Sequence, residues 1–307
     1  MSDGSADDPG APWVPIEDYT PEALRACEKA LRTIISRAGA WGPRLVLFGG
    51  LAPRYIVDSP PVDIGEHTGT TDLDVVVGLE IGIDDQGVYT KLQEELRNSG
   101  FRVSSEGSYA WERRVDGVRV ALEFFCPVEE AGEPGRLRRN PGGDVGSSLS
   151  AIQLRGAELA GADYRTVQLS GEVLDHGGHR DVAVRVANIL PFLVLKAFAL
   201  ETRDKEKDAY DIVWTLNAFG DQGPASAAEA AAESPVAGSA EVTAALEILT
   251  DRFRDSRTQG PSNYARFFLG AGGDEEQRMR LRRDAQGTVR AFLARWREVQ
   301  GLSLIHI

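Results

Sequence analysis

The stretch from Leu45 to Val77 constrains the fold more than any other part of the chain. It begins with the apolar run Leu-Val-Leu-Phe, continues through Gly49-Gly50 and an irregular segment, and ends in Thr-Thr-Asp-Leu-Asp-Val-Val-Val. A short apolar run bounded by turn residues is typical of a buried strand. Two glycines at its end let the backbone approach a ligand, because no Cβ stands in the way. The stretch therefore predicts two strands with a polar site between them.

The second of these strands carries Asp72 and Asp74 two residues apart. Alternate side chains of a strand share a face and lie about 7 Å apart, so both carboxylates are expected on one side. Carboxylates placed in this way can hold Mg²⁺ or Mn²⁺, as phosphoryl and nucleotidyl transfer require. An isolated Asp-x-Asp is also common at solvated strand edges, and that alternative stays open at this point.

A second charged group follows more than a hundred residues later, in a helix expected from Pro191 to about Ala218 and bent near Lys205. Spacings of seven, four and four residues place its members in one stripe of a continuous helix. They are Lys196, Arg203, Lys207 and Asp211. Such a stripe suits a triphosphate. The alternatives are a lysine that extends to solvent along a helix edge and, for Asp208 and Asp211, surface pairs with Arg203 and Lys207.

A third acid, Glu123, lies in the expected strand Val118–Phe125, which Asp116-Gly117 joins to the strand Tyr109–Val115. Asp-Gly between two apolar runs is a strong hairpin signal. Glu123 has the opposite phase to Val120 and Leu122, so it is expected to face away from the core. Glu112 is the rival candidate, and any exposed strand acid would show the same phase.

Taken together, these motifs resemble a known superfamily. Phe48-Gly49-Gly50 followed by Asp72-Leu73-Asp74-Val75 is similar to the pattern of DNA polymerase β-type nucleotidyltransferases. Lys196, Ala199-Leu200, Arg203 and Lys207-Asp208-x-x-Asp211 resemble the downstream signature of its AbiEii/AbiGii branch, the toxins of type IV toxin–antitoxin systems. The resemblance covers roughly residues 40–217. The sequence departs from the pattern in one respect, because about twenty residues separate Gly50 from Asp72, and the intervening loop is interpreted as an insertion.

The resemblance implies an α+β fold: a polymerase β-type core, in which helices flank a mixed sheet, with a helical C-terminal module. It also implies transfer of a nucleotide from an NTP to an acceptor hydroxyl. Asp72, Asp74 and Glu123 would bind magnesium, and Glu123 would assist or act as base. Gly49, Gly50, Thr71, Lys196, Arg203 and Lys207 would hold the nucleotide, and Asp211 would position the lysine or a metal. The acceptor implied by the family is the 3′ end of tRNA or another RNA, and the implied partner is a cognate antitoxin.

The remaining sequence suggests how the chain is divided. Residues 1–15 are expected to be disordered, 16–220 to form the nucleotidyltransferase domain, 221–240 an Ala/Ser/Gly/Pro-rich linker, and 241–301 a helical module. The last six residues, 302–307, continue no pattern and resemble a sequencing artefact. The final expected helix is rich in arginine, which suits phosphate contact: Arg278, Arg280, Arg282, Arg283, Arg290, Arg295 and Arg297. A solvated helix face is the alternative.

Composition excludes several classes of protein. The net charge of −13 gives no long-range attraction to nucleic acid or anionic lipid, so an RNA partner needs a local basic patch. Two cysteines without metal-ligand spacing indicate neither a disulfide framework nor a zinc site. No signal peptide or membrane span is expected, and a cytoplasmic location is the default. Two other functions stay open: transfer to a small hydroxyl compound, and a non-catalytic nucleotide-binding or partner-binding module.

Overall fold

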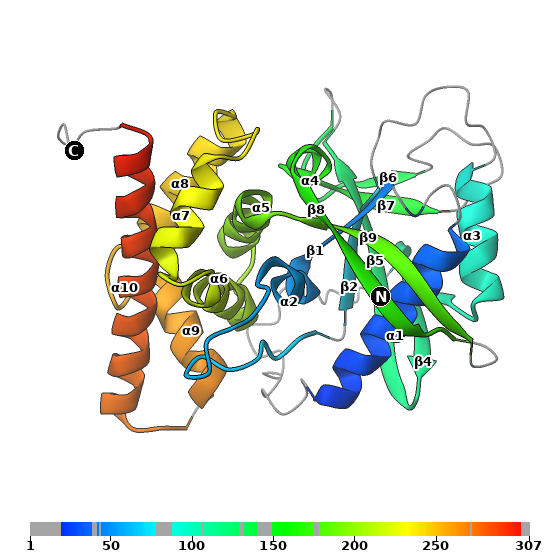
Figure 1. Ribbon diagram of the computed structural model, residues 1–307, viewed down its shortest axis with the longest axis horizontal. Coiled ribbons are helices and arrows are strands. Elements are labelled where there is room, and N and C mark those ends of the chain that lie inside the picture. Colours follow the sequence, from blue (N-terminus) through cyan, green and yellow to red (C-terminus); the bar gives the residue numbers. More distant parts are fainter. Residues whose placement is uncertain are drawn as a thin grey trace, which may run out of the picture.

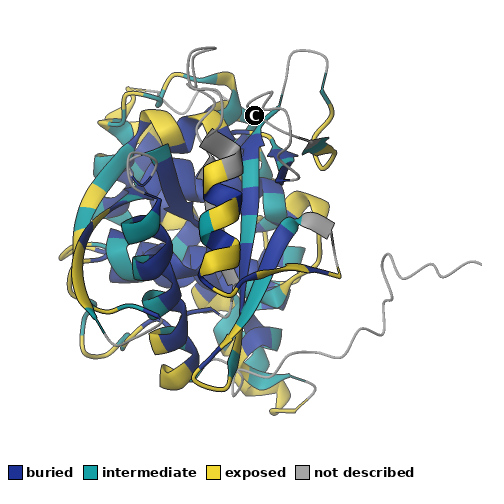
Figure 2. Cartoon of the chain, turned by 90° about the vertical axis from the view of Figure 1, so that its right-hand side faces the viewer, coloured by how far each residue is buried: buried dark blue, intermediate teal, exposed yellow. Residues whose placement is uncertain are grey.

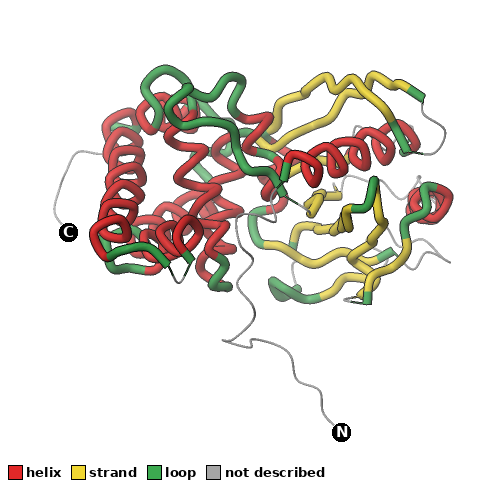
Figure 3. Tube along the Cα trace, turned by 90° about the horizontal axis from the view of Figure 1, so that it is seen from below, coloured by secondary structure: helices red, strands yellow, loops and turns green. Residues whose placement is uncertain are grey.

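The chain folds into a mixed sheet with helices on its faces and a largely helical C-terminal region (Figure 1). The computed structural model describes residues 20–38, 42, 44–70, 72–77, 88–105, 107–128, 132–139, 149–174, 178–270 and 272–301. Within residues 72–77 it describes the backbone alone. Figure 3 shows the strands gathered at one side of the molecule and the C-terminal helices at the other. The α+β class expected from the sequence is confirmed.

The described part of the chain contains a nine-stranded sheet in the order β3-β4-β5-β2-β1-β9-β8, and β7 branches from β5 and pairs with β6. The strands are β1 Leu45–Phe48, β2 Asp72–Val77, β3 Arg102–Ser104, β4 Gly107–Val115, β5 Val118–Pro127, β6 Leu137–Arg139, β7 Ser150–Leu154, β8 Tyr164–Glu172 and β9 His179–Ala187. The expected hairpin is present: Asp116 and Gly117 both have positive φ, as a two-residue turn of type I′ requires.

The two faces of the sheet are covered by different helices. Helix α1 (Pro21–Arg37) begins at the N-cap Thr20, whose hydroxyl accepts a hydrogen bond from the Ala23 amide. It packs on one face against β5, β8 and β9, where Val120 and Leu122 are fully buried, as their phase predicted. The other face meets α4 (Ala157–Ala162) and α5 (Ile189–Thr202), and Val46, Phe48 and Leu195 are buried together there.

The C-terminal region packs against α5 and α6 (Glu206–Ala218). Its helices are α7 Pro224–Ala232, α8 Ala240–Arg252, α9 Gln259–Leu269 and α10 Glu275–Val299. The arginine-rich helix expected near the C-terminus is α10, and Asp274 and Gln277 cap its start reciprocally. Figure 2 shows buried stretches on the strands and helices in the middle of the molecule and exposed stretches mainly at its outside. One apolar cluster includes both sheet residues and residues of α7, α8 and α10.

Three sequence expectations differ from the structure. The helix expected from Pro191 to Ala218 is two helices, because residues 203–205 are extended between α5 and α6. The alternation of residues over Leu159–Leu174 suggests a strand, but Leu159 lies in α4 and the strand, β8, begins only at Tyr164. Residues 221–240, expected to be a linker, contain α7. The alanines at 227, 228 and 231 are fully buried there, because small side chains let α7 pack closely on α10.

Several expectations lie outside the described residues: those on residues 1–15, on Thr71 and on the tail 302–307. The remaining helices are short: η3, a 3₁₀ turn over Gly49–Leu51, and α2 over Pro53–Ile56 follow β1, and α3, Val88–Asn98, precedes β3. Over the described ranges, each helix is too short or too polar to cross a bilayer.

Candidate functional site

The glycine pair lies where the sheet meets the charged helices. Gly49 has φ of +72°, a conformation that favours glycine, and this lets the chain turn directly from β1 into η3. A Cβ built on Gly50 would lie 2.8 Å from Nζ of Lys207 and 3.1 Å from Cβ and Oγ1 of Thr70. An alanine at position 50 would therefore force the end of the Lys207 side chain to shift away from the turn. The fold thus brings together Gly50 and Lys207, two residues to which the resemblance assigns nucleotide binding.

The acidic positions form part of one row across three strands. Phe48 of β1 is the Cα partner of Asp74 in β2, and Asp74 is the partner of Glu123 in β5. Paired positions of neighbouring strands share a face and lie about 5 Å apart. Positions 72, 74 and 123 therefore belong to one face, and position 74 adjoins the residue that precedes Gly49. The backbone register supports the expected carboxylate group, while the side chains of Asp72 and Asp74 are outside the described set.

Between the two candidates for the third acid, the register favours Glu123. Glu112 shares the face, since it pairs with Ala121, but β5 separates it from β2. Its carboxylate also accepts a hydrogen bond from Nε of Arg119 at 2.8 Å. Glu123 lies directly beside position 74 and is partly buried. Glu123 is thus the better placed of the two to complete a metal site with Asp74.

Next to the glycine pair lies a buried cluster of ion pairs. Nζ of Lys196 is 2.8 Å from Oδ1 of Asp208 and 2.7 Å from Oδ2 of Asp211. Arg203 binds Asp208 through Nε at 2.8 Å and Nη2 at 3.0 Å. Nζ of Lys207 is 2.7 Å from Oδ1 of Asp211. Asp208 and Asp211 are fully buried, so the interpretation of these acids as surface partners is wrong.

Burial and the neighbouring charges act in opposite directions on the pKa of each buried group in the cluster. Burial is the largest single influence and would raise the pKa of each aspartate, but the neighbouring groups together lower it: Lys196 with Arg203 at Asp208, and Lys196 with Lys207 and His67 at Asp211. The pKa of Asp208 falls to about 2, and that of Asp211 lies far below its usual range. Burial would lower the pKa of Lys196, but the two aspartates raise it. At Lys207 burial outweighs Asp211, and the pKa is lowered. Lys207, the basic residue beside Gly50, is therefore the lysine whose protonated form burial disfavours on balance.

The break between α5 and α6 explains how the cluster assembles. On a straight helix the four predicted charges would form a solvent-facing stripe, with lysines and acids on one surface. The extended residues 203–205 instead place α6 against α5, so that Lys196 of one helix inserts between Asp208 and Asp211 of the other. The sequence therefore identified the participants correctly and their geometry wrongly. Lys196 joins the two helices, and Lys207 is the cation nearest the glycine turn.

Sequence reasoning missed His67, which lies in the loop interpreted as an insertion. Its Nε2 is 2.9 Å from Oδ1 of Asp211, and its ring is buried between Tyr210 and Trp214. The same loop places Thr70 against Gly50. The segment is therefore a wall of the site. A lone histidine in a glycine-rich loop gives no sequence signal, because its partner is 144 residues away in the chain.

The acidic row is the part of the site whose residue types could hold a metal ion. Among the side chains that the structure describes, no group of three or more His, Cys, Asp or Glu residues could hold a metal ion. The backbone nevertheless brings three acidic positions together on neighbouring strands, and oxygen donors are the ligands that Mg²⁺ prefers. The residue types and their register fit a magnesium site formed by Asp72, Asp74 and Glu123.

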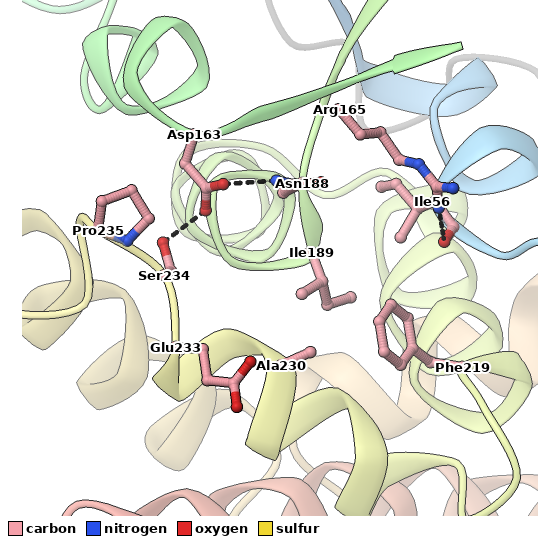
Figure 4. Close-up of a pocket in the computed structure, with 10 residues that line it drawn as sticks. All are labelled: Ile56, Asp163, Arg165, Asn188, Ile189, Phe219, Ala230, Glu233, Ser234 and Pro235. Carbon is pink, nitrogen blue, oxygen red and sulfur yellow. Dashed lines mark hydrogen bonds between the residues drawn. The ribbon is translucent and has the colours of Figure 1, made fainter.

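A separate cavity of about 240 Å³ lies between the sheet and α7 (Figure 4). Its polar wall is already satisfied internally, because Asp163 accepts hydrogen bonds from Asn188 and Ser234. Arg165 on the opposite wall donates to the Ile56 carbonyl and to Asp58. These contacts tie the α7–α8 connection and α2 to the sheet. They make the cavity a weaker candidate than the glycine turn.

The site at Gly49-Gly50 thus combines a row of acidic positions on β2 and β5 with a buried cationic cluster on α5 and α6. Comparisons of the chain with protein-family models, with curated proteins and with solved structures found no match.

Proposed function

We propose that the protein is a magnesium-dependent nucleotidyltransferase, which transfers a nucleotide from an NTP to an acceptor hydroxyl. One observation carries the proposal: the contact of Gly50 with Lys207, at the end of the strand whose last residue pairs with Asp74. In this proposal Lys207 binds phosphate beside the row of acidic positions on β2 and β5. The two halves are more than a hundred residues apart in the sequence, and both are needed for metal-assisted phosphoryl chemistry.

In this proposal the acceptor oxygen attacks the α-phosphorus of the NTP and the bond to the β-phosphate oxygen breaks, so pyrophosphate leaves. The amides of Gly49 and Gly50 and the ammonium of Lys207 hold the phosphates. Asp72, Asp74 and Glu123 would hold magnesium, and Glu123 would accept the acceptor's proton. Bound magnesium would stabilise charge on the attacking and leaving oxygens. Lys196 and Arg203 affect the phosphates indirectly, because both form ion pairs with the buried Asp208.

The acceptor we propose is an RNA 3′ end, such as that of tRNA, in keeping with the resemblance to toxins that act with an antitoxin. Exposed arginines on α10 support an RNA acceptor. Arg280, Arg283, Arg290 and Arg297 are all exposed, and helical spacing places them in one stripe, away from the buried Ala285, Val289 and Trp296. A stripe of arginines can contact successive phosphates.

The test incubates the protein with labelled NTPs, magnesium and total tRNA. Wild type is expected to transfer label and Asp72→Ala is expected not to. Equal labelling by the two proteins would refute catalysis at this site. Magnesium-dependent NTP binding without turnover on any acceptor would favour a non-catalytic module instead.

A second comparison of variants tests whether the acceptor is an RNA or a small hydroxyl compound. Charge reversal at two exposed arginines, Arg283→Glu with Arg290→Glu, should reduce transfer to RNA and spare transfer to a small hydroxyl compound. The matched control reverses Arg252, which lies in the last turn of α8, outside the α10 stripe. Loss of RNA transfer in the control alone would refute the assignment of the RNA surface to α10.

A further inference from the structure

The hydrogen bonds of His67 define its tautomer. Nδ1 accepts a hydrogen bond from the backbone amide of Gly69 at 3.0 Å, so this nitrogen carries no proton. A neutral imidazole then has its proton on Nε2. Nε2 therefore donates to Oδ1 of Asp211, at 2.9 Å. The orientation of the ring is set by the loop backbone, and the imidazole directs one donor at one carboxylate oxygen.

That carboxylate oxygen is shared with the site lysine. Oδ1 of Asp211 is also 2.7 Å from Nζ of Lys207, while Oδ2 is 2.7 Å from Nζ of Lys196. A carboxylate held at both oxygens cannot rotate freely. Its position determines where Nζ of Lys207 lies, and that nitrogen contacts the Gly50 turn. The chain of contacts runs from the loop through His67 and Asp211 to Lys207.

We propose that His67 is a positioning residue, which orients Asp211 and through it holds Lys207 against the Gly49-Gly50 turn. Its role in nucleotide binding rests on the proposed function, whereas its effect on Lys207 does not. The ring is fixed independently of the acid, since Tyr210 and Trp214 pack against it with centroids 5.1 and 4.8 Å away. The loop is thereby coupled to the phosphate-binding end of the site.

The structure offers a matched control on the same loop. The amide of Thr68 donates to the Tyr210 hydroxyl at 3.1 Å, which anchors the loop to α6 without involving Asp211. Tyr210→Phe removes this anchor and keeps the ring that packs on His67. His67→Gln keeps a side-chain N–H that can reach Asp211, whereas His67→Ala removes the donor. His67→Met fills the volume without a donor and replaces the alanine variant if that variant does not fold.

The first readout is the rate at which an amine-reactive acetylating reagent modifies Lys207, followed by peptide mass spectrometry below the unfolding temperature of every variant. The second readout is the Kd of each NTP with magnesium, measured by calorimetry. In His67→Ala, or in His67→Met in its place, Lys207 should react about tenfold faster. NTP binding should weaken about tenfold, equivalent to about 1.4 kcal/mol. His67→Gln should restore most of both values, and Tyr210→Phe should change neither by more than about twofold.

The outcomes separate the two proposals. An unchanged Lys207 rate in the variants without a donor would overturn the positioning role, and so would an equal increase in Tyr210→Phe. A wild type that binds no NTP would overturn the proposed function, while the Lys207 rates would still decide the role of His67. Faster modification in His67→Ala that His67→Gln does not reverse would also overturn the role, because the effect would then follow packing rather than the hydrogen bond.

Discussion

The buried His67 should make stability depend on pH in a window where few other groups titrate. Burial lowers its pKa from 6.5 to about 4, although Asp211 opposes the change. Between these values the unfolded chain binds a proton at His67 and the folded chain does not, so the free energy of unfolding falls as pH falls. One pKa unit corresponds to about 1.36 kcal/mol, so the complete effect is about 3 kcal/mol. Between pH 7.5 and pH 5 it is about 2 kcal/mol.

The assay is urea unfolding of wild type and His67→Gln at several pH values between 7.5 and 5. Glutamine has no charge to gain, so the variant should lack this component, and the difference between the two proteins isolates it from other titrations. The free energy of unfolding of wild type should fall by about 2 kcal/mol more than that of the variant over this range. The m-values should agree, which would show that the unfolded states expose similar surface.

Parallel pH profiles for the two proteins would refute the reasoning. They would show that His67 titrates in the folded protein as it does in the unfolded chain. The argument that burial lowers the pKa of His67 would then be wrong.

Three further predictions concern the buried cluster and the glycine turn. Asp211→Asn should lower the free energy of unfolding by about 3–5 kcal/mol, because two buried lysines lose an anionic partner. The control, Asp251→Asn at an exposed position, should change it by less than about 0.5 kcal/mol. Urea unfolding midpoints measure both variants, and equal effects would contradict the burial argument. Gly50→Ala should weaken NTP binding about tenfold, since its Cβ would displace Nζ of Lys207, while Gly238→Ala, which meets open space, should bind normally in calorimetry. Removal of divalent cations with EDTA should abolish transfer and added magnesium should restore it, as a radiolabel assay would show; transfer that persists in EDTA would rule out a metal-dependent reaction.

The sequence predicted the strand elements of the site well, because each of them follows from local pattern. Alternation placed Val120 and Leu122 in the core and Glu123 on the other face, and Asp116-Gly117 fixed the hairpin that aligns β4 with β5. The pairing of Asp74 with Glu123 is a long-range property that depends on the parallel contact of β2 with β5. From the sequence, the proximity of Asp74 and Glu123 could be predicted only because the motifs resemble those of the nucleotidyltransferase superfamily.

The helical half of the site shows why local pattern was insufficient. The spacing of the charged residues from Lys196 to Asp211 is compatible with one straight helix. The packing of α6 against α5 through ion pairs is a tertiary effect, which local spacing does not reveal. His67 depends on tertiary contact to a still greater degree, because its hydrogen bond joins a loop to a helix far along the chain. The alanine-rich segment at 224–232 reads as low complexity, yet small side chains are what close packing on α10 requires.

The most direct test of the central claim uses one acceptor RNA and two labelled forms of the same NTP. If the site catalyses nucleotidyl transfer, label on the α-phosphate will enter the acceptor and label on the γ-phosphate will appear in pyrophosphate. Asp74→Asn will abolish both, although it will unfold at the same urea concentration as wild type to within experimental error. Entry of γ-label into the acceptor, or full activity of Asp74→Asn, would contradict the claim.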